Sequence, residues 1–275
     1  MANVKNVFVS GGFDDLKSTQ VRFLQEAARI GPVHVLLWSD EVVRRLQGKA
    51  PKFPQAERIY FLESLRYVCG VTLCADNVRP DALPLCEPSN PAIWAFIEDD
   101  DTSAKQDYCR SHGLEYRLLR NDDLQGFPDE PGDVTETSSR KRVIVTGCYD
   151  WLHSGHVRFF EEVSALGDLY VVVGQDANIE FLKGKGHPLF SEQERRYMVQ
   201  SVRFVKQGLI SSGMGWLDAE PEIELIKPDI YAVNEDGDKP EKLEYCQAHG
   251  IEYRILKRLP KDGLPRRIST DLRGF

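Results

Sequence analysis

The stretch Val143-Ile144-Val145-Thr146-Gly147-Cys148-Tyr149-Asp150-Trp151-Leu152-His153-Ser154-Gly155-His156 decides the fold of this chain. An apolar run ends in a glycine turn and a helical pattern follows, which predicts a strand, a turn and a helix start at Ser154. The N–H groups at a helix start point at a bound anion, and the helix dipole favours its charge. Gly155 lets a phosphate approach the backbone closely. The motif predicts a phosphate site, and the alternative is a pair of histidines that only cap a helix.

The second half of the chain repeats the first. Residues 7–14 match 143–150 at an offset of 136 residues, and 108–117 match 245–254 at an offset of 137. This period is far longer than that of solenoid repeats, so we expect two domains of one fold. The predicted domains are 1–125 and 141–275. The segment 126–140 between them is acidic and rich in Pro, Gly, Ser and Thr, which is typical of a linker.

Strands and helices alternate within each half. In the second half the pattern predicts strands at 142–146, 168–174, 229–233 and 251–256, with helices at 154–166, from Ser191, and at 239–249. Strands that read as continuous apolar runs indicate a sheet covered by helices on both faces. We therefore predict an α/β protein with two tandem Rossmann-like, doubly wound parallel sheets. Ligands of such sheets bind at the carboxyl ends of the strands, where the His153 loop falls.

The two copies differ where chemistry is expected. Lys17-Ser18-Thr19-Gln20 stands where the second half has residues 153–156, and Gln47 stands where it has Lys183. The first half has no counterpart of the closing segment 267–273. Positions kept in both copies, such as Arg58 and Arg195, are predicted to serve the scaffold. The second half is therefore expected to be catalytic and the first half pseudo-catalytic.

Composition narrows the class of protein. The chain has 275 residues, 41% of them hydrophobic and 28% charged, and a formal net charge of −8. That charge argues against nucleic acid as a partner, because a long footprint on phosphates needs a basic face. No apolar run suits a signal peptide or a membrane span. The six scattered cysteines form no CxxC pair and no zinc set, so we expect free thiols and a cytoplasmic protein.

Residues 147–156 resemble the GxFDxxHxGH signature of the cytidylyltransferase-like nucleotidyltransferases. Leu182-Lys183-Gly184 is similar to the lysine segment of that family, and Ile268-Ser269-Thr270 resembles its RTEGIST closing motif. The resemblance covers 141–275, and the tandem arrangement is similar to that of ethanolamine-phosphate cytidylyltransferase. The arginine and glycine of the closing motif are not in register here, and its second threonine is replaced by Asp271. These departures lie in nucleotide-binding loops, so they leave the base and the acceptor open.

The resemblance implies roles for particular residues. His153, His156 and Lys183 would be catalytic, because nucleotidyl transfer needs groups that position a triphosphate and neutralise spreading charge. Trp216 would lie near the acceptor, and a surface or core tryptophan is the alternative. Mg²⁺ would be held mainly by the triphosphate, without a protein metal site. The implied nucleotide-binding residues are Gly147, Cys148, Tyr149, Asp150, Gly155, Lys185, Asn234, Glu235, Asp236, Arg267, Ser269 and Thr270.

The expected reaction is transfer of CMP from CTP to a small phosphorylated alcohol, with release of pyrophosphate. An adenylyltransferase acting on a sugar phosphate or a similar phosphate is the alternative, which Leu182-Lys183-Gly184 followed by His187-Pro188 also suits. A second alternative is a nucleotide sensor without turnover, favoured by the altered closing motif. The first half kept its apolar pattern, so we expect it to pack against the second half, either within the chain or across a homodimer.

Overall fold

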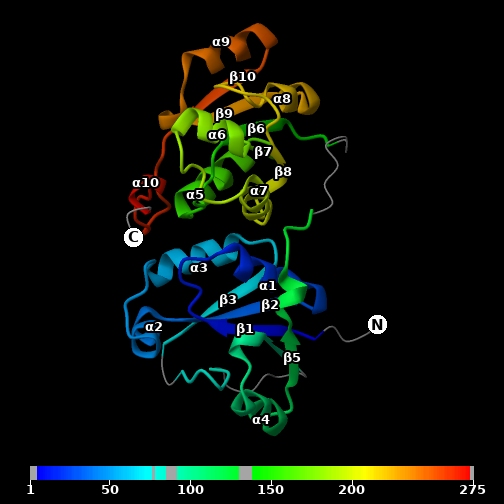
Figure 1. The fold of residues 1–275 in the computed structure, drawn as a ribbon, viewed down its shortest axis with the longest axis vertical. Helices are drawn as coiled ribbons and strands as arrows, with labels where there is room; N and C mark the ends of the chain where they lie inside the picture. Colours follow the sequence, from blue (N-terminus) through cyan, green and yellow to red (C-terminus); the bar gives the residue numbers. More distant parts are fainter. Residues whose placement is uncertain (1–4, 76–77, 85–91, 130–137, 273–275) are drawn as a thin grey trace. The chain divides into compact units, whose positions relative to one another are not determined.

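The computed structural model describes residues 5–75, 78–84, 92–129 and 138–272. The chain forms two compact units, an N-terminal unit Met1–Gly126 and a C-terminal unit Phe127–Phe275. Most of the predicted linker, residues 130–137, lies outside the described residues. Each unit has its own sheet and its own core, and Figure 1 shows the elements of both.

The N-terminal unit alternates strands and helices in the way the sequence predicts. Its elements are β1 (Val7–Gly11), α1 (Ser18–Ile30), β2 (Val33–Trp38), α2 (Asp40–Gln47), α3 (Gln55–Ser64), β3 (Val68–Cys74), β4 (Ile93–Ile97), η1 (Glu98–Asp100), α4 (Ser103–Ser111), β5 (Glu115–Leu119) and η2 (Asn121–Leu124).

The C-terminal unit repeats this order and adds a short closing helix. Its elements are β6 (Arg142–Gly147), α5 (Ser154–Ser164), β7 (Asp168–Val173), α6 (Asp176–Lys183), α7 (Glu192–Gln200), β8 (Val205–Ile210), α8 (Glu220–Ile226), β9 (Ile230–Asn234), η3 (Glu235–Gly237), α9 (Pro240–His249), β10 (Glu252–Leu256) and α10 (Ser269–Leu272).

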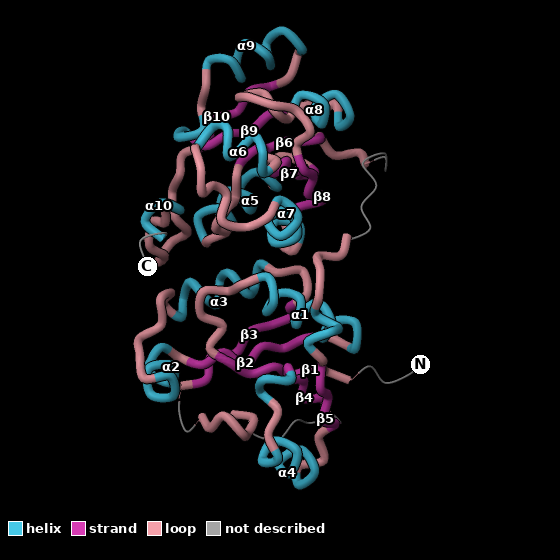
Figure 2. Tube along the Cα trace, viewed as in Figure 1, coloured by secondary structure: helices cyan, strands magenta, loops and turns pink. Residues whose placement is uncertain are grey.

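Both sheets are parallel and share one topology. The strand orders are β3-β2-β1-β4-β5 and β10-β9-β6-β7-β8, which are the same order read in opposite directions. The chain reverses its direction of winding after β3 and after β8, so each sheet is doubly wound. The α/β, Rossmann-like fold class is therefore confirmed. Figure 2 shows helices on both sides of the strands in each unit.

The core of the C-terminal unit explains where its site lies. Every residue of β7 is buried, as expected for a strand covered on both faces. One core cluster joins Ile144 of β6 and Tyr231 of β9 to Ile223 of α8 and Tyr245 of α9. Right-handed crossovers place α5, α6 and α7 on the opposite face of the sheet. The carboxyl ends of β6 and β9, between these two layers, form the switch point at which ligands bind in such folds.

Most predicted elements of the C-terminal unit end within two residues of the observed ones. The predicted elements do not include helix α6, whose last residue is Lys183. At the predicted helix start, Ser191 Oγ accepts a hydrogen bond from Glu194 N at 3.3 Å, which fixes the start of α7.

The described cysteines are free thiols, and Cys86 lies outside the described residues. No described helix has the length and apolar character needed to cross a lipid bilayer.

Candidate functional site

His153 is the N-cap residue of helix α5. Its Nδ1 atom accepts a hydrogen bond from Gly155 N at 3.1 Å. A neutral imidazole that accepts at Nδ1 carries its proton on Nε2. The Nε2 atom lies 3.2 Å from Ser269 Oγ at the start of α10, so Nε2–H is the donor there. His153 therefore caps helix α5 with Nδ1 and presents a hydrogen-bond donor at Nε2.

His156 lies one helical turn further and stacks on His153. The two ring centroids are 3.9 Å apart, with an interplanar angle of 27°. The Tyr149 ring meets His156 edge-on, with centroids 5.3 Å apart, and also packs on Phe160. The Nδ1 atom of His156 is buried and has no hydrogen-bond partner among the described residues. A buried, unpaired polar atom is costly, which is tolerated more readily where a ligand completes the contacts.

Both histidines are held neutral. Burial lowers the pKa of His153 to about 3, and the charges of Arg258 and Arg267 act in the same direction. Burial also lowers the pKa of His156, assisted by His153, Arg258 and Lys183, while a hydrogen bond with the Trp151 backbone opposes the shift. The site therefore offers neutral imidazole donors beside a group of permanent cations.

Arg258 is a site residue that the sequence analysis missed. It lies in the irregular segment between β10 and α10, and its side chain is only 14% exposed. The guanidinium forms an ion pair with Asp236 and donates a hydrogen bond to Arg267 O at 3.4 Å. Because Arg258 lies in a segment without helical or strand periodicity, no sequence pattern indicated it.

The closing segment folds over the start of α5. A small cavity there is lined by Ser154 and Gly155 and by residues of the closing segment, Arg258, Leu259, Pro260, Lys261, Leu264, Pro265, Arg266 and Arg267. A Cβ atom on Gly155 would lie 3.0 Å from His153 Cε1 and 3.4 Å from Arg267 O, so this close approach favours glycine. Arg267 and Ser269 thus lie beside the histidine motif. The side chain of Thr270 lies outside the described residues.

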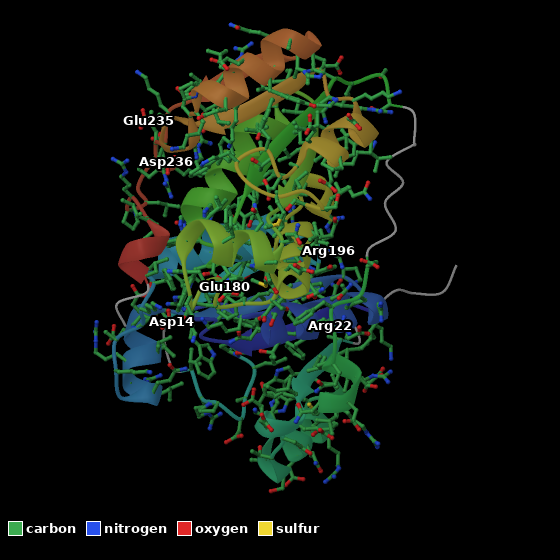
Figure 3. The ribbon with its side chains drawn as sticks, turned by 45° about the horizontal axis from the view of Figure 1, so that its top comes forward. Asp14, Arg22, Glu180, Arg196, Glu235 and Asp236 are labelled. Atoms are coloured by element: carbon green, nitrogen blue, oxygen red, sulfur yellow. The ribbon has the colours of Figure 1, made fainter. Side chains whose placement is uncertain are left out.

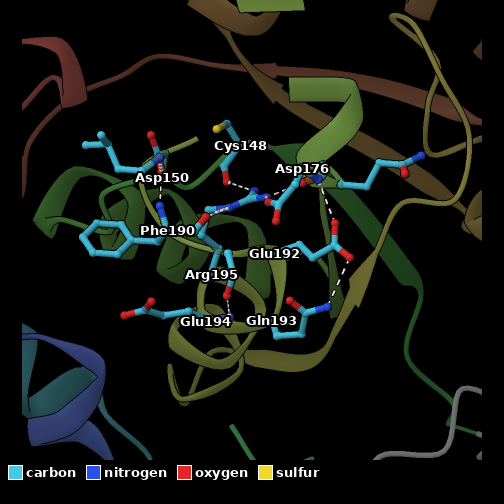
Figure 4. Close-up of polar contacts among 12 residues, drawn as sticks. Cys148, Asp150, Asp176, Phe190, Glu192, Gln193, Glu194 and Arg195 are labelled. Atoms are coloured by element: carbon cyan, nitrogen blue, oxygen red, sulfur yellow. Dashed lines mark hydrogen bonds and ion pairs between the residues drawn. The ribbon is translucent and has the colours of Figure 1, made fainter. Parts of the chain in front are cut away.

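Asp150 and Arg195 build the scaffold of this loop (Figure 4). Asp150 is buried and accepts hydrogen bonds from Leu189 N at 2.6 Å and Phe190 N at 3.1 Å. Arg195 donates to the carbonyl oxygens of Phe190, Cys148 and Gly174 at 2.7–2.9 Å and to Asp176 Oδ1 at 2.6 Å. Asp150 and Cys148, predicted to bind nucleotide, therefore shape the loop by these contacts.

The N-terminal unit has the same scaffold. Asp14 accepts from Lys52 N at 2.7 Å and Phe53 N at 2.9 Å. Arg58 donates to Phe53 O and Trp38 O at 3.0 Å, to Gly12 O, and to Asp40 Oδ1 at 2.7 Å. Positions shared by the two copies thus make the same contacts, which supports a structural role for both arginines.

Gly147 and Tyr149 form the turn after β6. Tyr149 has φ 51°, and its counterpart Phe13 has φ 45°, a left-handed conformation that is uncommon for aromatic residues. A Cβ on Gly147 would lie 2.8 Å from Tyr149 Cζ, so the buried ring requires glycine at this position. The Tyr149 ring packs on His156 and Phe160, and its role in nucleotide binding stays a prediction.

Lys183 and Lys185 lie at the end of helix α6. Both side chains are exposed. Lys183 is close enough for its charge to lower the pKa of His156, so the structure brings it to the histidine pair. Lys185 stands between Gly184 and Gly186, both with φ 90°, in an exposed turn.

Glu235 and Asp236 directly follow β9, at the carboxyl edge of the sheet, where the His153 loop also lies. Glu235 and Asp236 are marked in Figure 3. Asp236 is paired with Arg258, and Glu235 is exposed. The Oδ1 atom of Asn234 is buried without a hydrogen-bond partner among the described residues, so this acceptor is unsatisfied there.

Trp216 lies on the loop that precedes α8, where it is 55% exposed. Asn178 of α6 fixes this loop through both backbone groups of Gly215, at 2.7 Å and 3.1 Å. The Lys239 ammonium lies 4.7 Å from the centroid of the Trp216 ring. Trp216 is therefore an exposed side chain on a loop that hydrogen bonds hold in place, and it is not a core residue.

Comparisons with known proteins identify the family to which the chain belongs. A family profile described as "Cytidylyltransferase-like" matches residues 144–248, from β6 into α9. The chain belongs to the cytidylyltransferase-like family of HxGH nucleotidyltransferases, as the sequence motif indicated.

Curated relatives include two kinds of protein. The chain is 38% identical over 136 residues to "FAD synthase" of Aciduliprofundum boonei, which is 48% of this chain and 84% of that protein. It is 28% identical over 245 residues to "Bifunctional protein HldE" of Syntrophotalea carbinolica, which is 83% of this chain. The chain spans about half the length of that second relative, 48%. A solved structure titled as a lipopolysaccharide core biosynthesis protein from Thermoplasma volcanium matches 44% of the chain and 98% of its own, with 26% identity and a TM-score of 0.38.

Proposed function

We propose that the C-terminal unit transfers AMP from ATP to a phosphate monoester and releases pyrophosphate. An oxygen of the acceptor phosphate attacks the α-phosphorus of ATP. The bond from that phosphorus to the oxygen bridging to the β-phosphorus breaks, and its electron pair leaves with pyrophosphate. The observation that carries the proposal is the stacked, neutral His153–His156 pair at the start of α5, beside Ser269 and a group of cations.

The choice of ATP over CTP rests on the relatives. FAD contains an AMP group, so a relative named FAD synthase favours adenylyl transfer, the reading that the sequence offered as its alternative. The expected preference for CTP has no such support. The open Asn234 Oδ1 could accept a hydrogen bond from an exocyclic amine, but adenine and cytosine both carry one.

Each residue acts by position and charge. The His153 Nε2–H would donate to a phosphate oxygen in place of Ser269, and His156 would support the bridging oxygen on the same helix face. Lys183 would bring a cation from the end of α6. Arg258 and Arg267 would neutralise the leaving pyrophosphate at the α5 start, where the helix dipole also favours negative charge.

Mg²⁺ fits this site as a companion of the triphosphate. No group of three or more His, Cys, Asp or Glu side chains among the described residues is arranged to hold a metal. Asp150 is committed to Leu189 and Phe190, and Asp236 to Arg258. Bound through phosphate oxygens, the ion would supply further charge neutralisation.

The N-terminal unit would not turn over. At its equivalent edge Lys17 pairs with Asp15 at 3.1 Å, and Lys52 pairs with the same carboxylate at 3.3 Å. Asp15 stands where the C-terminal unit has Trp151. Both lysines are committed to this carboxylate, and the two histidines of the C-terminal unit have no counterpart here.

Pyrophosphate release tests the proposal. The full chain would be mixed with ATP or CTP and Mg²⁺, and with single acceptors that include flavin mononucleotide, sugar phosphates and phosphorylated alcohols. ATP-dependent release with one acceptor class is expected, and His156→Ala should remove it, while Gln20→Ala at the equivalent position of the N-terminal unit should not. Release with CTP alone would restore the cytidylyl reading. Tight nucleotide binding without release in any mixture would favour the sensor.

A further inference from the structure

Lys242 is a buried lysine that nothing in the nucleotide site uses. It lies in the first turn of α9 and is 9% exposed. Its ammonium is 3.5 Å from Thr146 Oγ1, near the end of β6, and 3.4 Å from Gly237 O, and it stands 5.6 Å from the Tyr231 ring centroid. Both polar contacts are long for hydrogen bonds, and no carboxylate among the described residues forms an ion pair with it.

The N-terminal unit holds its counterpart lysine by a shorter contact. Lys105, the counterpart 137 residues earlier, is buried to the same degree, and its ammonium donates to Asp100 O at 2.6 Å. Asp100 is the counterpart of Gly237, so the same lysine-to-loop contact is 2.6 Å in one copy and 3.4 Å in the other. The scaffold does not need a loosely held ammonium.

The two units also differ at the strand ends close to this lysine. In the N-terminal unit the indole of Trp38 donates to Ser10 Oγ at 2.9 Å, at the carboxyl ends of β2 and β1. At the equivalent positions, the C-terminal unit has Thr146 in place of Ser10 and Gly174 in place of Trp38. The indole at this strand end in one copy is thus replaced by a glycine in the other, against which Ile179 and Asp218 pack. Asp218 and Asp238 are the acidic groups whose charges act on Lys242, and Ser211 Oγ donates to Asp218 at 2.7 Å.

The direction of attack places the acceptor on this side. Attacking and leaving oxygens of a phosphoryl transfer stand roughly in line. In the proposed function the leaving pyrophosphate lies at the start of α5 with Ser269 and Arg267. The acceptor must then approach from the other layer, where α8 and α9 cover the sheet and the core cluster contains Ile144 and Tyr231. Trp216 and Lys239 lie on that same side, at the loop before α8 and the start of α9.

We propose that Lys242, with the Thr146 hydroxyl, binds the phosphate of the acceptor, the group that attacks ATP. This rests on the proposed function and names the group that the acceptor side of the site recognises. A phosphate oxygen would replace the two long contacts of the ammonium with short, charge-assisted ones. Trp216 and Lys239 would then face the rest of the acceptor.

The test uses the full chain with α,β-methylene-ATP bound, so that the triphosphate site is filled, and titrates inorganic phosphate as the probe by thermal shift and calorimetry. Phosphate should bind the unaltered protein and Lys105→Met equally. Binding to Lys242→Met should be roughly ten- to hundred-fold weaker, as expected for the loss of one charge-assisted hydrogen bond. Lys242→Arg keeps the charge and should retain part of the affinity, which separates loss of a ligand contact from loss of folding.

Two outcomes would overturn the proposal. One is equal phosphate binding by Lys242→Met and the unaltered protein, and the other is an equal loss of binding in Lys105→Met. Failure of the proposed function would look different, because α,β-methylene-ATP itself would then not bind. In that case the phosphate titration without nucleotide still compares Lys242→Met with Lys105→Met, and a difference between them would still support a phosphate contact.

Discussion

The imidazole rings of His153 and His156 lie 3.9 Å apart, centroid to centroid, and nearly parallel. Two positive charges at this separation would repel strongly in a buried site, so the arrangement suits two neutral rings. Gly155 N–H fixes the tautomer of His153 by donating to Nδ1. In the proposed function the pair would act through oriented N–H donors, and the full positive charges near the phosphates would come from Lys183, Arg258 and Arg267.

The neutral state of His153 makes the stability of the ligand-free protein depend on pH. Its pKa is about 3 in the folded chain and about 6.5 in an unfolded one, so the unfolded state binds the extra proton between these values. The contribution of His153 to the free energy of unfolding should be complete above pH 6.5. It should fall as the pH drops, by about 2 kcal/mol at pH 5. Asparagine at 153 keeps the N-cap acceptor. Thermal midpoints of His153→Asn should fall less steeply over pH 6.5–5 than those of the unaltered protein, and parallel slopes would contradict the assignment.

Removing either histidine should damage chemistry more than folding. His156→Ala and His153→Ala should each lower kcat by roughly 10²–10³-fold, the usual effect of losing one donor aimed at transition-state charge. The acceptor found by the pyrophosphate assay would serve as substrate, and circular dichroism would check the fold. Normal turnover by both variants would mean that the site lies elsewhere.

Lys183 and Gln47 end equivalent helices, α6 and α2, and provide a second matched pair. Lys183→Ala should remove most of the activity, because it removes a cation close to His156, whereas Gln47→Ala should leave kcat/KM unchanged. Calorimetry should count one triphosphate per chain. Two equivalent sites would show that the N-terminal unit is not degenerate.

The sequence predicted the parts of this site that local pattern controls. The turn between β6 and α5 could be predicted because an apolar run, a glycine and a helix start lie next to one another. The scaffold role of Arg195 could be inferred because the repeat supplied Arg58 for comparison. Arg258 could not be predicted, since its partner Asp236 lies 22 residues away and neither stands in a periodic element. The role of Asp150 was also hidden, because its contacts are to backbone N–H groups 39 and 40 residues later.

Arg58 and Arg195 should respond alike to substitution. Each is almost fully buried and bonds several backbone carbonyl oxygens, so replacement by methionine leaves those acceptors unpaired. Arg58→Met and Arg195→Met should each destabilise their unit by about 3 kcal/mol or more. Differential scanning calorimetry would show this as a lower midpoint in both variants. An Arg195→Met protein with an unchanged midpoint and no activity would instead mean that Arg195 contacts a ligand.

Arg258 should affect the nucleotide and His153 together. Its positive charge lowers the pKa of His153, so Arg258→Met should raise that pKa toward its usual value, with burial still holding it below 6.5. The same change removes a cation from the cavity at the α5 start, so ATP should bind roughly ten-fold more weakly or worse. Nuclear magnetic resonance of the imidazole protons would give the pKa, and calorimetry the affinity. Asp236→Asn provides the control, because it releases the arginine from its ion pair but keeps the charge. ATP should then bind at least as tightly as before. If Asp236→Asn weakens binding as much as Arg258→Met does, Arg258 acts by holding the loop after β9 in place and not by contacting the phosphates.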